Sequence, residues 1–365
     1  MYRVLYEGNV IYSSGTEGGL AFRLHLSEKE NRPAKFSFYL PAKNPYVKSL
    51  ETGKGEIAVY EIRNEAPADE TEIFRGKITE IRSDFQNTRY VECTGVMGYL
   101  TNSLQRPLEH INQTPYQFLS GLLERHNEQA PEEEKIYPGE VTVEGSISCF
   151  TGYETTLECI RQALLKNMGG RITVRRLEGK NYLDYLAGYQ SVDNQAIEFG
   201  KNLLDLSGTV DISETYTVCI PLGMGQGENP VETQDTYLTI ESVNDGKDYV
   251  EHETAAALYG YRPKAVFFRD VTDPLLLKQK GEAWLQENSG ERFSLKVTAL
   301  DCSGGDGKSG DFKPGNEIMV RSTGHGIDGR FPVTERDWYL DEPENNTVIM
   351  EKRLLPEGGG ETENL

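Results

Sequence analysis

The chain has 365 residues, a mass of 41.0 kDa and a formal charge of −20, from 38 basic and 58 acidic residues. This charge opposes stable binding to nucleic-acid phosphates or to anionic lipid. Thirteen Phe, twenty Tyr and two Trp provide enough aromatic surface for folded cores, which argues against a disordered chain. The length fits about two to four domains.

The first hundred residues have the pattern of short strands. Period-two alternation or an aromatic run predicts strands at residues 4–12, 35–40, 57–61, 73–82 and 90–94. Gly, Pro and Asn separate these segments, and residues 64–72 form an acidic loop. Such spacing is typical of an antiparallel barrel or sandwich, which we expect at residues 1–104.

Helical periodicity follows in the next segment. Thr114 and Gln117 have the spacing of a capping box with Pro115 in the first turn. Apolar residues then share one face with His126, and a second helix is predicted at residues 154–168. Gly169 and Gly170 end it before a strand at residues 171–175. These features predict an α+β domain at residues 105–190.

Strand-like segments return after residue 200. They lie at residues 203–206, 215–221, 237–243, 293–300, 318–321, 333–340 and 347–352. A short helix is predicted at residues 254–259. A longer one begins at Asp273–Pro274, with one face formed by Leu276, Leu277, Lys280 and Trp284. We predict a second β-rich domain at residues 191–355, with a helix-containing segment inserted at about 245–292, and a disordered tail at 356–365. The fold class is thus α+β, β-rich and multi-domain.

No nucleotide or metal motif is complete. Residues 306–309 resemble part of a phosphate loop, but Cys302 stands where its first glycine belongs. His252 and Glu253 begin a zinc-protease pattern that needs a second histidine where Ala256 stands. The glycines at 223–227 lack dinucleotide-binding spacing. Aspartates 301, 306 and 311 do not match a calcium loop.

Signals for catalysis are also weak. The sequence has no Gly-x-Ser-x-Gly motif and its five histidines are scattered. His126 is expected to be a packed core residue. Carboxylate pairs are too common among 58 acidic residues to be informative. We therefore assign no catalytic, cofactor-binding or metal-binding residue, and expect no cofactor.

The cysteines and the hydropathy pattern suggest a cellular setting. An odd number of cysteines without a CxxC spacing predicts free thiols in a reducing compartment. The cysteines are Cys93, Cys149, Cys159, Cys219 and Cys302. The chain's start has no apolar signal-peptide core, and no stretch approaches the ~20 apolar residues of a membrane span. We expect a soluble protein that is made in the cytoplasm and has no membrane anchor.

Several segments resemble the tail-tip hub proteins of bacteriophages and prophages. This family of minor structural proteins is often labelled "prophage endopeptidase tail" or "tail-associated lysin". The similar segments are residues 202–207, 215–223, 238–250, 270–274, 297–301, 325–328 and 343–347. Each is weak alone, but their order and spacing over residues 195–352 make the resemblance specific.

The resemblance implies a structural role in the virion, at a tail tip or baseplate. Such hubs carry two barrel domains that are similar to the tail-tube fold, here residues 1–104 and 191–355. A homotrimer would present six of them in a ring that closes or caps the tail tube. The implied partners are the tail tube and a distal tail protein ring, with a tape-measure protein and a fibre or separate lysin as further candidates.

The family label does not by itself imply catalysis. In many relatives the wall-degrading activity belongs to an appended C-terminal domain, which needs on the order of 100 residues. The hub-like region here ends near Arg353, so we expect no enzyme. The alternatives are a tail-associated cell-wall hydrolase and a receptor- or sugar-binding tail module, for which residues 182–189 offer tyrosines. The acidic charge serves either solubility or a channel lining that repels DNA.

Overall fold

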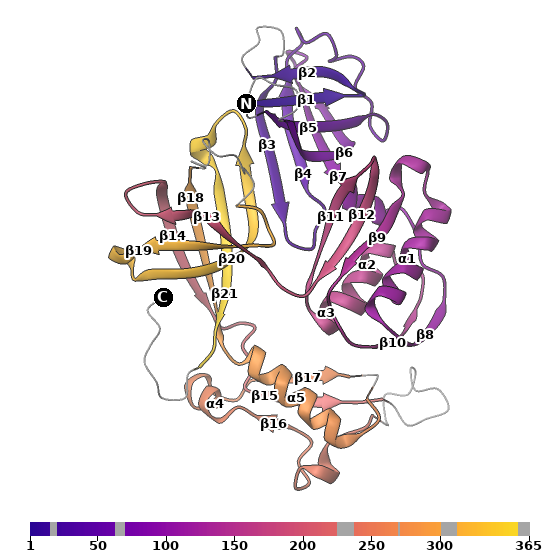
Figure 1. The fold of residues 1–365 in the computed structure, drawn as a ribbon, viewed down its shortest axis with the longest axis vertical. Coiled ribbons are helices and arrows are strands. Elements are labelled where there is room, and N and C mark those ends of the chain that lie inside the picture. The colour runs from indigo at the N-terminus through magenta and orange to yellow at the C-terminus, as the bar shows by residue number, and fades with distance from the viewer. Residues whose placement is uncertain (15–19, 63–69, 225–236, 269–270, 301–311, 357–365) are drawn as a thin grey trace.

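The computed structural model describes residues 1–14, 20–62, 70–224, 237–268, 271–300 and 312–356. Seven strands form the N-terminal unit (Figure 1). They are β1 (Tyr2–Tyr6), β2 (Asn9–Ser13), β3 (Phe22–Lys29), β4 (Lys35–Leu40), β5 (Glu56–Ile62), β6 (Glu70–Ser83) and β7 (Arg89–Gly95). The predicted strands are confirmed, except that residues 4–12 form two strands. Glu7 and Gly8 lie between these two strands with positive φ.

The α+β unit follows a 3₁₀ helix at Val96–Thr101. Its elements are β8 (Leu108–Gln113), α1 (Pro115–Gln129), β9 (Ile136–Val141), β10 (Ile147–Thr151), α2 (Thr156–Ile160), a π-helical turn (Arg161–Leu165), α3 (Lys166–Met168), β11 (Arg171–Leu177) and β12 (Lys180–Leu186). The capping box of α1 is present as predicted. The last helical turn ends at Gly169, and both Gly169 and Gly170 have positive φ.

The C-terminal unit contains β13 (Gln190–Glu198), β14 (Leu203–Asp211), β18 (Glu291–Ala299), β19 (Asn316–Ser322), β20 (Ile327–Tyr339) and β21 (Thr347–Leu354). The strands predicted at residues 333–340 and 347–352 are confirmed, and β20 and β21 pair antiparallel as a hairpin. Strands of the N-terminal and C-terminal units belong to one 13-stranded sheet, joined where β20 pairs with β3. One hydrophobic core also spans both units, from Val4 to Met350.

The inserted unit lies between β14 and β18 and is orange at the bottom of Figure 1. It contains β15 (Val218–Leu222), β16 (Val250–Glu251), α4 (Glu253–Tyr259), β17 (Pro263–Phe267) and α5 (Pro274–Asn288). It begins earlier than the expected boundary near 245, because Asp211 at the end of β14 already pairs with Arg292 of β18.

Two details of this unit correct the sequence prediction. The strand predicted at residues 237–243 is wrong, because Glu241–Val243 forms a 3₁₀ turn. The buried face of α5 consists of Leu277, Gly281 and Leu285, whereas Leu276 is 45% exposed. Gly281 sets this face, since a Cβ there would lie 2.9 Å from the Pro221 ring on β15. None of the helices in the described part of the chain is long and apolar enough to span a membrane.

Candidate functional site

The seam between β3 and β20 joins the two β-rich units. Leu26 and Trp338 are paired there, and both side chains are buried. Two ion pairs and one histidine–carboxylate pair accompany this contact: Lys29 with Glu335, Glu28 with Arg336, and His25 with Asp337. Apolar packing and polar contacts therefore act together to hold the units in one orientation.

Asp337 is a seam carboxylate that has both His25 and Ser27 as hydrogen-bond partners. His25 Nε2 lies 2.9 Å from its Oδ1, and the imidazole stacks on Tyr339 with ring centroids 4.5 Å apart. The hydrogen bond from His25 lowers the pKa of Asp337, although burial opposes this. Ser27 also hydrogen-bonds to Asp337. The carboxylate thus lies between the hydroxyl and the imidazole, which is not the order that activates a serine nucleophile.

The turn between β3 and β4 reaches the α+β unit. Asn31 has a left-handed φ of 58°. Its carbonyl oxygen accepts hydrogen bonds from Nη2 and Nε of Arg161 at 3.0 and 3.3 Å, while its Oδ1 accepts from the backbone N of Ile172 at 2.7 Å. One turn residue therefore binds the π-helical turn and β11.

The C-terminal β-rich unit also contacts the β3–β4 turn. The backbone N of Glu30 donates to the Thr334 carbonyl at 2.8 Å, and its carboxylate accepts from the Tyr189 hydroxyl at 3.0 Å. Burial raises the pKa of Glu30. The Gln190 amide donates to Gly315 O at 3.0 Å. All three larger units consequently converge at residues 29–33.

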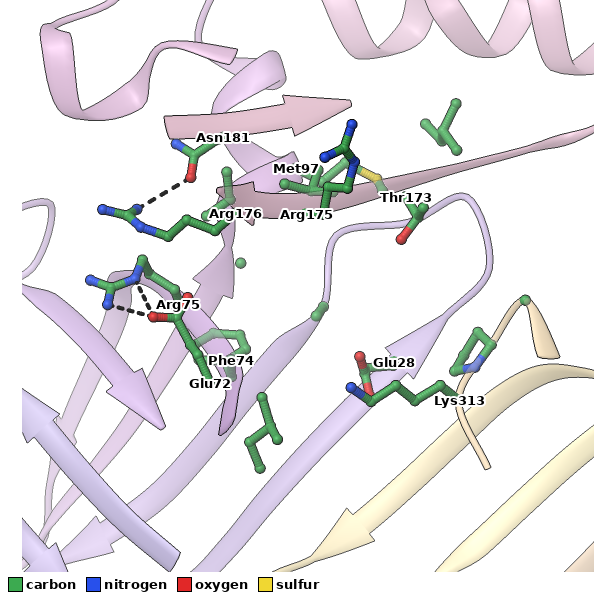
Figure 2. A pocket seen from close by; sticks show the side chains of 18 of the residues that line it. Glu28, Glu72, Phe74, Arg75, Met97, Thr173, Arg175, Arg176, Asn181 and Lys313 are labelled. Carbon is green, nitrogen blue, oxygen red and sulfur yellow. Dashed lines mark hydrogen bonds and ion pairs between the residues drawn. The ribbon is translucent and has the colours of Figure 1, made fainter. Parts of the chain in front are cut away.

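A cleft of about 750 Å³ opens at this junction (Figure 2). Its walls come from the ends of β3 and β6, the 3₁₀ helix after β7, β11, and residues 313–315. The basic side chains that line it are Lys29, Arg32, Arg75, Arg171, Arg175, Arg176 and Lys313, and the acidic ones are Glu28, Glu30, Glu70, Glu72 and Glu178. In a chain with 20 excess negative charges, this is a locally basic site.

At least six of the twelve charged side chains of the cleft have ion-pair partners. Glu28 pairs with Arg336, Glu70 with Arg3, Glu72 with Arg75, Lys29 with Glu335, and Arg175 with Asp184. Nη1 of Arg176 donates to the Asn181 amide oxygen at 3.3 Å. Among the described residues, neither Arg32 nor Arg176 has a carboxylate within ion-pair distance. Figure 2 shows Arg176 projecting on the same side of the cleft as Arg75.

The sequence motifs do not meet at this cleft. Aspartates 301, 306 and 311, residues 306–309 and glycines 225 and 227 lie outside the described residues. His252 instead caps α4, since its Nδ1 accepts from the Ala255 amide at 3.3 Å. The described residues contain no group of three or more potential metal ligands.

Two further Ser–His pairs are structural. Ser103 donates to Nδ1 of His126 at 2.7 Å, and the imidazole Nε2 donates to the Glu134 carbonyl at 3.1 Å. Both side chains are buried, and burial lowers the pKa of His126, which keeps it neutral. This confirms His126 as a core residue. Ser322 and His325 also lie 2.7 Å apart, without a carboxylate partner in the part that the structure describes.

The buried cysteines are unreactive thiols. Burial raises the pKa of Cys159 and of Cys219 to about 12, and it raises the pKa of Cys93 further. Thiolates are therefore scarce at neutral pH. No disulfide is present among Cys93, Cys149, Cys159 and Cys219, as the sequence predicts for free thiols.

No sequence motif indicates the junction or its cleft. Asn31 stands in a Glu-Asn-Arg-Pro stretch that is typical of a turn, and the alternation of residues 22–29 is typical of a strand. These signals could have located the β3–β4 hairpin. They could not show which residues it contacts.

Comparison with known proteins gives the wider setting. Residues 191–353 match the family described as prophage endopeptidase tail. The fold is similar to that of a tail protein from Neisseria meningitidis MC58, with a TM-score of 0.61, 15% identity, and 97% of this chain and 96% of that chain covered. No curated protein matches the sequence significantly.

Two other solved tail proteins share the fold. Prophage tail protein gp18 from Listeria monocytogenes EGD-e has a TM-score of 0.58 and 12% identity, with 96% of this chain and 94% of that chain covered. The 43 kDa tail protein of prophage MuSo2 from Shewanella oneidensis has a TM-score of 0.59 and 13% identity, with 98% and 99% covered. Residues 191–353 thus match the prophage endopeptidase tail family, and the chain shares its fold with these three tail proteins.

Proposed function

We propose that the chain is a structural hub of a phage or prophage tail tip or baseplate. Its homotrimer would form a ring that closes or caps the tail tube and docks the distal tail ring. The observation that carries this proposal is the β3–β20 seam, which holds both β-rich units in one 13-stranded sheet. A ring built from two such units per chain requires a fixed angle between them, and the charged pairs and shared core supply it.

The same proposal assigns the parts of the chain. Residues 1–104 and 191–355 would be the two tube-like barrel domains, with residues 105–190 as an α+β domain beside them and 356–365 as a tail. The tape-measure protein, and a fibre or a separate lysin, are further proposed partners. The protein would be made in the host cytoplasm and act in the virion.

We propose a structural rather than an enzymatic role. Support comes from the described Ser–His pairs, which are buried or lack a carboxylate, and from the similarity to tail proteins. The family description nevertheless contains the word endopeptidase, which keeps a cell-wall hydrolase as the second candidate. A cell-wall zymogram distinguishes them: clearing by the purified chain would favour the hydrolase.

The decisive measurement is the molar mass in solution, by light scattering behind a sizing column. We expect three times 41.0 kDa and, in electron micrographs, rings with threefold symmetry. The distal tail ring should co-elute with this species. A chain that remains monomeric at high concentration, both alone and with that partner, would contradict the proposed hub.

A further inference from the structure

We infer that the cleft at the junction binds an acidic segment of a second copy of this chain. The inference rests on the proposed ring and names one of its contacts. Three arginines carry it: Arg32 after the β3–β4 turn, and Arg171 and Arg176 on β11. They line one cleft but come from two different units.

These arginines carry positive charge that the described residues offset only in part. Arg32 and Arg176 have no ion pair there. Arg171 donates its Nε to the Gly188 carbonyl at 2.8 Å, and its charge also lowers the pKa of the Glu30 carboxyl. The charge of Arg32 also contributes to lowering the pKa of Arg161, after burial. Three of the five acidic side chains of the cleft already bind other arginines. A carboxylate that enters would therefore meet attraction.

The backbone at Arg32 and the side chain of Arg176 are positioned before a ligand binds. Arg32 directly follows Asn31, whose backbone and side chain are bonded to the α+β unit. Arg176 contacts the buried Asn181, which in turn donates to the Lys135 carbonyl at 3.2 Å. Guanidinium groups bind carboxylates through two parallel hydrogen bonds, and prior ordering lowers the entropic cost of doing so.

Charge complementarity favours a second copy as the occupant. Each chain has a formal charge of −20, so three copies repel one another unless local contacts offset the repulsion. In a cyclic ring the contacts are heterologous: a patch on one protomer meets a different patch on the next. Each interface of the ring would then contain one basic cleft, which binds the acidic surface of the neighbouring protomer.

The first test compares two variants with equal net charge. Arg32→Glu with Arg176→Glu adds four negative charges per chain in the cleft. Lys43→Glu with Lys48→Glu adds the same four at exposed positions outside it. The two variants therefore have the same net charge, so the overall repulsion between protomers is equal in both. By analytical ultracentrifugation we expect the cleft variant to dissociate at a concentration at least about tenfold above that of the control. Arg32→Lys with Arg176→Lys, which keeps the charge, should remain associated.

The second test identifies the occupant. The Arg→Lys variant is made in ¹⁴N and ¹⁵N forms, mixed while dissociated, concentrated and treated with a zero-length carbodiimide cross-linker. We expect the amines introduced at positions 32 and 176 to be joined to carboxylates in peptides of mixed isotope content. Cross-links confined to one isotope would overturn the inference.

The outcomes separate this inference from the proposed function. A trimer equally stable in the cleft variant and the control would overturn the cleft contact and leave the hub intact. Loss of binding to the distal tail ring with an unchanged trimer would assign the cleft to that partner instead. A monomeric parent chain would contradict both the ring and the contact.

Discussion

At the scale of single residues, Asn31 connects the β3–β4 turn to the α+β unit in two separable ways. Asn31→Gly keeps the left-handed backbone but removes the acceptor for the Ile172 amide, so we expect a loss of about 1 kcal/mol in the free energy of unfolding. Asn31→Ala adds backbone strain, which costs about 1 kcal/mol more. Urea unfolding measures both, and hydrogen exchange at Ile172 should accelerate in each. If both variants lose the same free energy of unfolding, backbone strain at position 31 does not contribute.

Asp337 gives the seam a pH dependence with a defined sign. Because its folded pKa lies below the ordinary 3.8, its contribution is fully present above that value and is lost as pH falls through the folded pKa. We expect Asp337→Asn to lower the free energy of unfolding by about 1 kcal/mol at neutral pH, and the difference from the parent chain to shrink below about pH 4. Chemical unfolding across this range measures it. Asp328→Asn is the control, since that carboxylate is 55% exposed. A constant difference down to pH 2 would contradict this origin.

At the scale of elements, the inserted unit is separable from the main sheet. Asp211 and Arg292 are paired across β14 and β18 and lie 3.3 Å apart as an ion pair. We therefore expect that residues 212–290 can be deleted and replaced by an Asn-Gly turn that joins β14 directly to β18. Arg353 loses its contacts to the carbonyls of residues 214, 288 and 290, yet the inserted unit has a core of its own. We expect a change of no more than about 1 kcal/mol in the stability of the sheet, measured by hydrogen exchange of β3 and β20. Loss of protection in those strands would show that the insertion supports the fold.

Local elements could be predicted from the sequence where one signal decided them. The capping box at Thr114 and the strand pattern of residues 35–40 predicted α1 and β4 correctly, because both signals depend on neighbouring residues. The strand predicted at 237–243 was wrong because a short apolar run does not specify its partner strand. Pairing of His25 with Tyr339, and a cleft whose lining runs from Glu28 to Gly315, depend on tertiary contacts that periodicity does not encode.

At the scale of the whole molecule, net charge and the basic cleft make opposite predictions for DNA. The cleft offers few unpaired cations, whereas the chain as a whole carries −20, so long-range repulsion should prevail at low salt, where screening is weak. We expect no increase in the fluorescence anisotropy of a labelled 30-base-pair duplex (about three helical turns) at about 50 mM salt. This should hold for chain concentrations up to about 100 µM, which is the weak end of ordinary non-specific binding. A basic DNA-binding protein serves as the positive control. If the parent chain binds the duplex in a salt-sensitive way and the variant Arg32→Glu with Arg176→Glu does not, the cleft binds phosphate. The acidic surface would then not prevent DNA from binding. Absence of binding by parent and variant alike would support a channel whose walls repel DNA.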